Sequence, residues 1–174
     1  MILLTPLQFA TAATTYNLTY DANGNLIQGI DNYYEYNDFN QLSRVRLSNA
    51  TGTILEEYLY DHEGERVRKI EYHAGGGNTT TYYAGKEFVR KVNSSGTFDT
   101  RFVYQGNVLI AREESNGEKF FYHPDHLGST NIVTNASGDV VEETEYDPYG
   151  QVLDGGSSRY LYTAKELDAG SELY

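Results

Sequence analysis

Eight tyrosines, each followed by a turn-forming sequence, divide this chain into repeats of similar length. Each tyrosine ends a run rich in β-forming residues, and successive ones lie 16 to 24 positions apart. The sequences that follow, such as YDANGNL, YDHEGERV and YDPYGQVL, contain the Asp, Asn and Gly that favour chain reversal. Self-similarity of this kind indicates a repeat architecture. Its anchor residues are Tyr20, Tyr36, Tyr60, Tyr83, Tyr104, Tyr122, Tyr146 and Tyr162.

The segments between these turns alternate as β-strands with one buried face do. In residues 98–104, Phe98, Phe102 and Tyr104 share one face, and the other face carries charge. Residues 66–72 are less regular, because charges fall on both faces. A second set of turns has the pattern N-x-[ST]-G and starts at Asn49, Asn93 and Asn135. The sequence therefore predicts an all-β fold of consecutive antiparallel β-hairpins, with only a short helix-compatible stretch at 163–168.

Composition narrows the class of protein further. The 174 residues suffice for one domain, and with few aliphatic residues the 17 tyrosines must fill part of the core. A net charge of −12 argues against nucleic acid and anionic lipid as partners. The chain has no cysteine for disulfides or thiolate chemistry, and no apolar run long enough to form a membrane-spanning helix.

The repeats resemble YD repeats, the tyrosine-aspartate units of rearrangement-hotspot (Rhs) proteins, toxin-complex C components and teneurins. The more specific part of the resemblance is PDHLGSTNIVTNASGDVVEETEYDPYGQVL, followed by YTAKELDAGSELY, which is similar to the start of the Rhs repeat-associated core domain. The resemblance implies a spiralling β-sheet that forms part of a hollow shell. It divides the chain into an N-terminal strand-like arm (1–15), YD-repeat β-hairpins (16–122) and the start of the Rhs core (123–174).

In those families the shell encloses a toxin polypeptide or forms the body of a cell-surface receptor. In the toxin members, the core domain cuts its own chain downstream by means of aspartates. This sequence has eight units, too few to enclose a folded cargo, and its second core motif has Ala164 where the family usually has Gly. The catalytic aspartates have no matching positions here, so we expect no catalytic residue, no enzymatic activity and no cofactor.

Three polar motifs resemble functional sites but are better explained as structure. His123, Asp125, His126 and Ser129 lie within seven residues, yet Pro and Gly mark this stretch as a turn rather than a zinc site or a catalytic triad. The stretch that starts at Asp21 begins like a calcium-binding loop but has neither the Gly nor the Glu that such a loop requires. An acidic cluster, expected to be a solvated strand face, comprises Glu142, Glu143, Glu145 and Asp147.

Five N-x-[ST] sequons indicate candidate glycosylation sites. Three of them, Asn49, Asn93 and Asn135, occupy equivalent turns, and Asn78 follows a triple-glycine loop. Asn17 is the weakest candidate, because it lies near a strand start. The alternative is that Asn-rich turn chemistry produces the pattern without any sugar.

The first ten residues are apolar but have no hairpin turn that links them to the first repeat. We expect a strand-like arm that docks on a sheet edge, either of its own chain or of a second copy. A secretory signal is the alternative, although the segment has no basic start and contains Pro6. The apolar side chains of this assembly arm are Ile2, Leu3, Leu4, Leu7 and Phe9.

Two functions follow as hypotheses. The first is a non-enzymatic, extracellular or cell-surface structural and adhesive protein, which associates with copies of itself through strand edges, into a closed oligomer or a filament. The second is a piece of an Rhs or toxin-complex shell that encapsulates a toxin. A carbohydrate-binding adhesin is a weaker possibility, and an enzyme the weakest.

Overall fold

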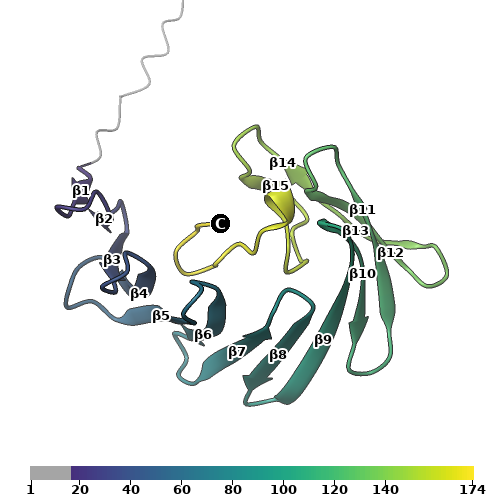
Figure 1. The fold of residues 1–174 in the computed structure, drawn as a ribbon, viewed down its shortest axis with the longest axis horizontal. Coiled ribbons are helices and arrows are strands. Elements are labelled where there is room, and N and C mark those ends of the chain that lie inside the picture. Colours follow the sequence, from purple (N-terminus) through teal and green to yellow (C-terminus); the bar gives the residue numbers. More distant parts are fainter. Residues whose placement is uncertain (1–16) are drawn as a thin grey trace, which may run out of the picture.

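In the computed structural model, which describes residues 17–174, one long antiparallel sheet accounts for most of the chain. Its thirteen strands lie in sequence order, each paired with the next (Figure 1). The first seven strands are β1 (Thr19–Tyr20), β2 (Leu26–Gln28), β3 (Asn32–Tyr36), β4 (Leu42–Leu47), β5 (Ile54–Tyr60), β6 (Arg66–Tyr72) and β7 (Asn78–Ala84). The remaining six are β8 (Phe88–Asn93), β9 (Gly96–Gln105), β10 (Val108–Glu114), β11 (Lys119–Pro124), β12 (Thr130–Asn135) and β13 (Val140–Glu143). The predicted succession of antiparallel hairpins is confirmed.

The turns explain why an aspartate follows the repeat tyrosine. In the turn after β5, Asp61 Oδ1 accepts hydrogen bonds from the backbone N–H groups of Glu63 and Glu65, both at 2.9 Å. Gly64 takes the positive φ of +88° that the reversal requires. The same carboxylate or amide pattern closes the turns that begin at Asp21, Asn37, Asp125, Asn135 and Asp147.

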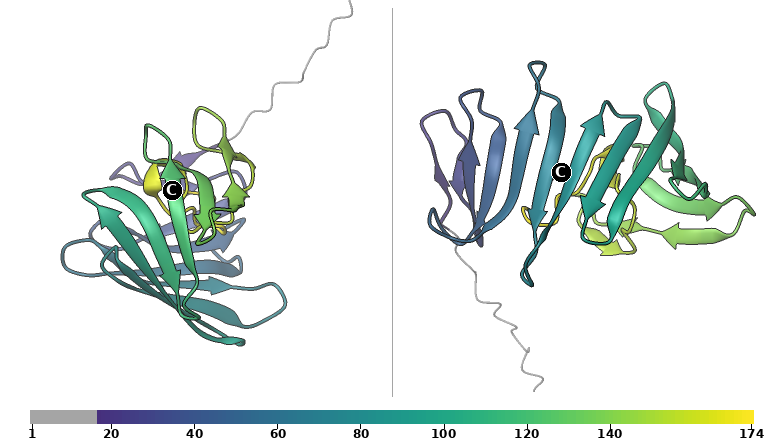
Figure 2. Two further views of the ribbon diagram at one scale, coloured as in Figure 1. Left: turned by 90° about the vertical axis from the view of Figure 1, so that its right-hand side faces the viewer. Right: turned by 90° about the horizontal axis from the view of Figure 1, so that it is seen from below.

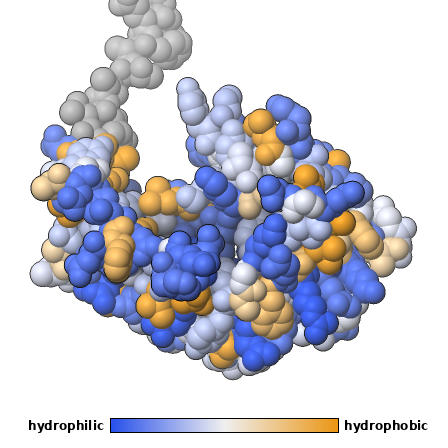
Figure 3. Space-filling view, in the orientation of Figure 1, coloured by the Kyte–Doolittle hydropathy of each residue, from blue (hydrophilic) through white to orange (hydrophobic). Residues whose placement is uncertain are grey.

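The sheet curves strongly, so that it has an inner concave face and an outer convex face (Figure 2). The inner face carries two buried clusters, one built from Tyr34, Val45 and Tyr58, the other from Val89, Phe102, Leu109, Tyr122 and Val133. The outer face carries rows of ion pairs, such as Arg46–Glu35–Arg44–Glu57. Hydrophilic and hydrophobic residues are accordingly mixed over the surface in Figure 3. The buried apolar side chains of the sheet therefore lie on the inner face.

After β13 the chain forms a separate hairpin, of β14 (Glu145–Tyr146) and β15 (Val152–Asp154), and then turns inward. Residues 155–174, which we name the C-terminal segment, run along the concave side of the sheet (Figures 1 and 2). The helix-compatible stretch forms only the 3₁₀ turn η1 (Tyr162–Ala164). Within residues 17–174, no helix is long and apolar enough to cross a membrane.

The last residues of the chain do not join an edge of the large sheet. Leu173 bridges back to Asp168, and the Tyr174 hydroxyl donates to Gly150 O at 2.8 Å. The end strands of the large sheet are β1 and β13. Because the C-terminal segment has charged partners on the inner face, it folds inward rather than along an edge.

Candidate functional site: the C-terminal segment on the concave face

The C-terminal segment is held on the inner face by a buried cluster of charges. Lys69 Nζ, from β6, donates to Glu166 Oε1 at 2.8 Å and to Asp168 Oδ1 at 2.9 Å. Arg66 lies three residues earlier in β6, beyond a shift in the β5–β6 register. It donates to Asp168 Oδ2 at 2.5 Å and to Glu166 Oε2 at 3.0 Å. Two further donors reach Glu166, from Arg159 and from the Tyr83 hydroxyl, both at 2.8 Å. Asp168 is thus bound by two donor residues and Glu166 by four, and the donors from β6 lie 97–102 residues away in sequence.

The charged side chains that make these contacts are buried. The side chains of Lys69 and Glu166 are only 3% and 7% exposed. Burial opposes ionisation of Glu166, but Arg159, Lys69 and Arg66 outweigh it and hold the pKa of that carboxyl below its usual value. Burial likewise opposes the charge of Lys69, yet Glu166 and Asp168 raise its pKa. Both partners are therefore charged at neutral pH, and removal of one would leave the other buried and uncompensated.

A second contact fixes the end of the segment at β5. Glu56, 1% exposed, accepts a hydrogen bond from Gly170 N at 3.0 Å and one from the Tyr58 hydroxyl at 2.5 Å. Asn32 Nδ2 donates to Gly170 O at 2.9 Å. A Cβ at position 170 would lie 2.8 Å from Glu56 Cδ, so that only glycine allows this approach. Burial raises the pKa of Glu56, although its hydrogen bonds lower it.

Contrary to the expectation of a solvated acidic face, Glu142 is buried where the segment begins. Ser158 N, Ser158 Oγ and Ser157 Oγ donate to its carboxylate at 2.8–2.9 Å, and Thr144 Oγ1 donates at 3.1 Å. Burial raises the pKa of Glu142, but these bonds outweigh burial and the net shift is downward. Glu143 and Glu145, in contrast, are exposed, and Asp147 closes a turn. The expectation was wrong for Glu142 because residues 155–158 return to cover its strand.

The anchor tyrosines differ in their environments. Tyr122 is buried, whereas Tyr20 is 57% exposed on the end strand β1. The other six anchors, Tyr36, Tyr60, Tyr83, Tyr104, Tyr146 and Tyr162, are half-buried. Several join neighbouring repeats through a hydroxyl-to-carbonyl bond, for example Tyr36 to Leu26 O, Tyr60 to Leu42 O and Tyr146 to Thr130 O. Tyr83 departs from this pattern, because its hydroxyl donates to Glu166.

The remaining candidate residues lie apart from this cluster. Asn49, Asn93 and Asn135 use their side-chain oxygens to accept backbone N–H bonds in their turns, and Asn17 and Asn78 are exposed. Glycosylation of these sequons stays a prediction. The assembly arm, including Ile2 and Phe9, lies outside the described residues.

The histidine motif and the calcium-like stretch are turns in the structure. Asp125 Oδ1 accepts from Leu127 N and Ser129 N, His126 is exposed, and Ser129 is fully buried without a histidine partner among residues 17–174. Asp21 binds Asn23 and Asn25 in the same way. Within the described part of the chain, no three His, Asp or Glu side chains are grouped so as to hold a metal ion.

The pattern of the sequence did not predict that Lys69, Arg66, Glu166 and Asp168 form one cluster. A signal was present, since residues 66–72 place a lysine on the face that neighbouring strands fill with aromatic residues. A charge at a position that should be buried requires a partner. Periodicity could not show where in the chain that partner lies, because the C-terminal segment is irregular apart from the short η1 turn.

Comparison with known proteins shows where this architecture occurs. The family model for the teneurin YD-shell matches residues 6–163. Human teneurin-1 is 31% identical over 138 residues, which cover 76% of this chain and 5% of teneurin-1. The tRNA3(Ser)-specific nuclease WapA of Bacillus spizizenii is 23% identical over 167 residues, covering 91% of this chain and 7% of WapA.

Solved structures share the fold. The pore structure of the Photorhabdus luminescens Tc holotoxin superimposes with a TM-score of 0.76 at 20% identity, covering 87% of this chain and 8% of that one. The TcdB2–TccC3 complex superimposes with a TM-score of 0.75 at 19% identity over the same share of this chain. This chain spans less than a tenth of the length of each of these proteins. It belongs to the teneurin YD-shell family.

Proposed function

We propose that this chain works as a structural wall segment of a YD-repeat shell, with the C-terminal segment lining its inner side. The observation that carries the proposal is the buried cluster of Lys69, Arg66, Glu166 and Asp168, which fastens that segment to the concave face. A single curved sheet exposes its inner apolar face unless something covers it. Here the chain supplies part of that cover itself.

The role is non-enzymatic in this proposal. The carboxylates of the cluster are each paired with cations, an arrangement that holds a segment in place but leaves no free base beside a nucleophile. WapA carries the name of a nuclease, but this chain corresponds to 7% of it. A location outside the cell, as the resemblance implies, is part of the same proposal.

Self-association through strand edges is a second candidate. The end strand β13 has no neighbour on one side among the described residues, and its Val140 and Val141 are 59% and 48% exposed. Such an edge pairs readily with another strand. The added strand could come from a longer chain of the same protein or from a second copy. Association of copies would give a closed oligomer or a filament.

Light scattering over a concentration series, combined with small-angle X-ray scattering, distinguishes these roles. A wall segment gives a monomer with the shape of a curved, open sheet. Edge association gives larger particles that Val141→Lys disrupts, whereas Val103→Lys, at an equally exposed valine in the centre of the sheet, leaves them intact. A compact particle without the open curvature would contradict both roles.

Deletion of residues 1–12 tests the assembly arm in the same measurements. If the arm supplies the added strand, the shortened chain no longer forms the larger particles. Persistence of the same oligomer would show that the arm does not drive association.

A further inference from the structure

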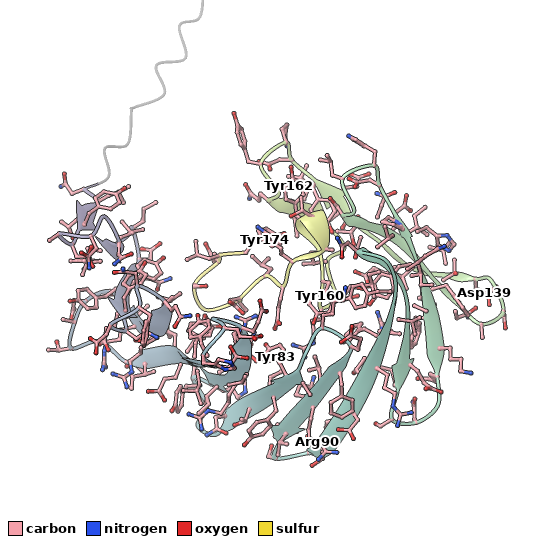
Figure 4. The ribbon with its side chains drawn as sticks, viewed as in Figure 1. Tyr83, Arg90, Asp139, Tyr160, Tyr162 and Tyr174 are labelled. Atoms are coloured by element: carbon pink, nitrogen blue, oxygen red, sulfur yellow. The ribbon has the colours of Figure 1, made fainter. Side chains whose placement is uncertain are left out.

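A cavity beside the C-terminal segment gathers three positive charges in a chain whose net charge is −12. Its volume is about 250 Å³, and Lys91 of β8, Arg112 of β10 and Arg159 of the C-terminal segment line it. Phe98 and Phe102 of β9 form its apolar part. Lys91 lies on the inner face, whereas the neighbouring Arg90 points outward (Figure 4). The cavity therefore belongs to the concave side of the sheet.

The three cations differ in how far their charge is compensated. Arg112 Nε donates to Glu114 at 2.8 Å, and Arg159 donates to Glu166 at 2.8 Å. Lys91 has neither an ion pair nor a hydrogen bond with any carboxylate of residues 17–174, and its Nζ lies 5.9 Å from the Phe98 ring centroid. A half-buried ammonium with only an aromatic ring beside it can still gain from an anion.

A second observation concerns the neighbouring strand β7, next to the cavity rather than in its lining. Thr81 is directly opposite Lys91 in the β7–β8 ladder and shares its face of the sheet. Its hydroxyl is fully buried and has no hydrogen-bond partner among residues 17–174. Buried polar atoms without a partner are rare in folded proteins and call for an explanation. Lys91 therefore has an unpaired hydroxyl, not a carboxylate, as its neighbour on β7.

We propose that this cavity binds a carboxylate group that is carried on an aromatic or aliphatic stem. Lys91 pairs with the carboxylate, and Phe98 and Phe102 contact the stem. A monoanion suits the cavity better than a phosphate dianion, because Glu114 also lines it. The carboxylate could belong to a free small acid or to an acidic side chain of a polypeptide. This site is separate from the proposed role as a wall segment and does not depend on it.

Titration of the full chain with phenylacetate, followed by protein NMR, tests the proposal. We expect the NMR signals of Lys91, Phe98 and Phe102 to change their chemical shifts in a saturable way. The neutral phenylacetamide should bind at least tenfold more weakly than phenylacetate. Equal binding of the acid and the amide would overturn the proposal, and this comparison requires no variant. Tighter binding of phenyl phosphate than of phenylacetate would also overturn it.

A pair of variants locates the site. Lys91→Gln should weaken phenylacetate about tenfold, which corresponds to about 1.4 kcal/mol. Lys119→Gln removes the same charge from an exposed lysine on β11 and should change the affinity less than twofold. Equal affinities in the two variants would show that the acid binds elsewhere.

Blocked tripeptides distinguish the two sources of the carboxylate. A Phe-Glu-Phe peptide that displaces phenylacetate and binds more tightly, while its Phe-Gln-Phe counterpart does not, identifies a polypeptide side chain as the ligand. If phenylacetate binds and neither peptide competes, the ligand is a free small acid. If none of the three binds wild-type protein, the proposal is wrong.

Discussion

Lys69 Nζ lies 2.8 Å from Glu166 Oε1, although 97 residues separate them in sequence, and both side chains are almost completely buried. This contact connects the sixth strand of the sheet to a segment that is irregular apart from the short η1 turn. The entropy lost when such a segment is ordered must be offset by the contacts that it makes. The buried charges are therefore the main candidates for what holds residues 155–174 in place.

Removal of one member of this pair should destabilise the protein strongly. We expect Lys69→Met or Glu166→Gln to lower the free energy of unfolding by about 3–5 kcal/mol, because the remaining charges stay buried without compensation. Lys69→Met combined with Glu166→Gln should lower the free energy of unfolding clearly less than the sum of the two single variants. Urea denaturation measures these values, and Arg90→Ala, which breaks an exposed pair with Asp99, is the control with a much smaller effect. Additive single losses would mean that the two residues do not interact.

Stability should fall at both ends of the pH range. The pKa values of Glu166 and Glu142 are lowered in the folded state, so their contribution is present above the ordinary value of about 4.5 and is lost as the pH falls through the folded values. The pKa values of Lys69, Tyr58 and Tyr83 are raised, so their contribution is lost as the pH rises above about 10. Thermal unfolding from pH 3 to 11 measures both limits.

Glu56 should act in the opposite sense to the other two glutamates. Its raised pKa makes a stabilising contribution that is present below pH of about 4.5 and is lost as the pH rises through the folded value. The free energy of unfolding of Glu56→Gln, compared with that of wild type, should therefore increase between pH 4 and pH 7. An effect of this variant that is independent of pH would show that Glu56 does not titrate in this range.

The turn aspartates should matter through their side-chain oxygens. Asp125→Ala removes the acceptor of two backbone N–H groups and is expected to cost about 1 kcal/mol, whereas Asp125→Asn keeps the acceptor, as Asn37 does in its own turn. Glu143→Ala, which removes an exposed carboxylate from β13, is the control. If the alanine and asparagine variants of Asp125 lower the free energy of unfolding equally, the charge of Asp125 rather than its acceptor oxygen stabilises the turn.

The anchor tyrosines should not be equivalent. Tyr122→Ala empties a buried position and is expected to cost about 3–5 kcal/mol. Tyr20→Ala, on an exposed end strand, should cost less than about 1 kcal/mol. Half-buried anchors such as Tyr60 and Tyr104 should lie between the two. A uniform loss across the repeats, measured by denaturation, would contradict this order.

The sequence predicts the sheet well, because its information is local. A tyrosine, a turn and an alternating strand recur within each repeat, so hairpins of neighbouring strands follow directly. The burial of Glu142 and the pairing of Lys69 with Glu166 could not be predicted in this way. Both depend on where residues 155–174 return in space, and a segment held by side-chain contacts has no period to detect.

Hydrogen exchange of residues 155–174, followed by mass spectrometry, measures whether this segment is docked on the concave face. The docked arrangement predicts that backbone amides of this segment in wild-type protein exchange far more slowly than those of an unstructured peptide. It also predicts that Lys69→Met selectively removes this protection while β9 to β12 stay protected. Exchange of residues 155–174 at the unstructured rate in wild-type protein would contradict the docking of this segment on the concave face.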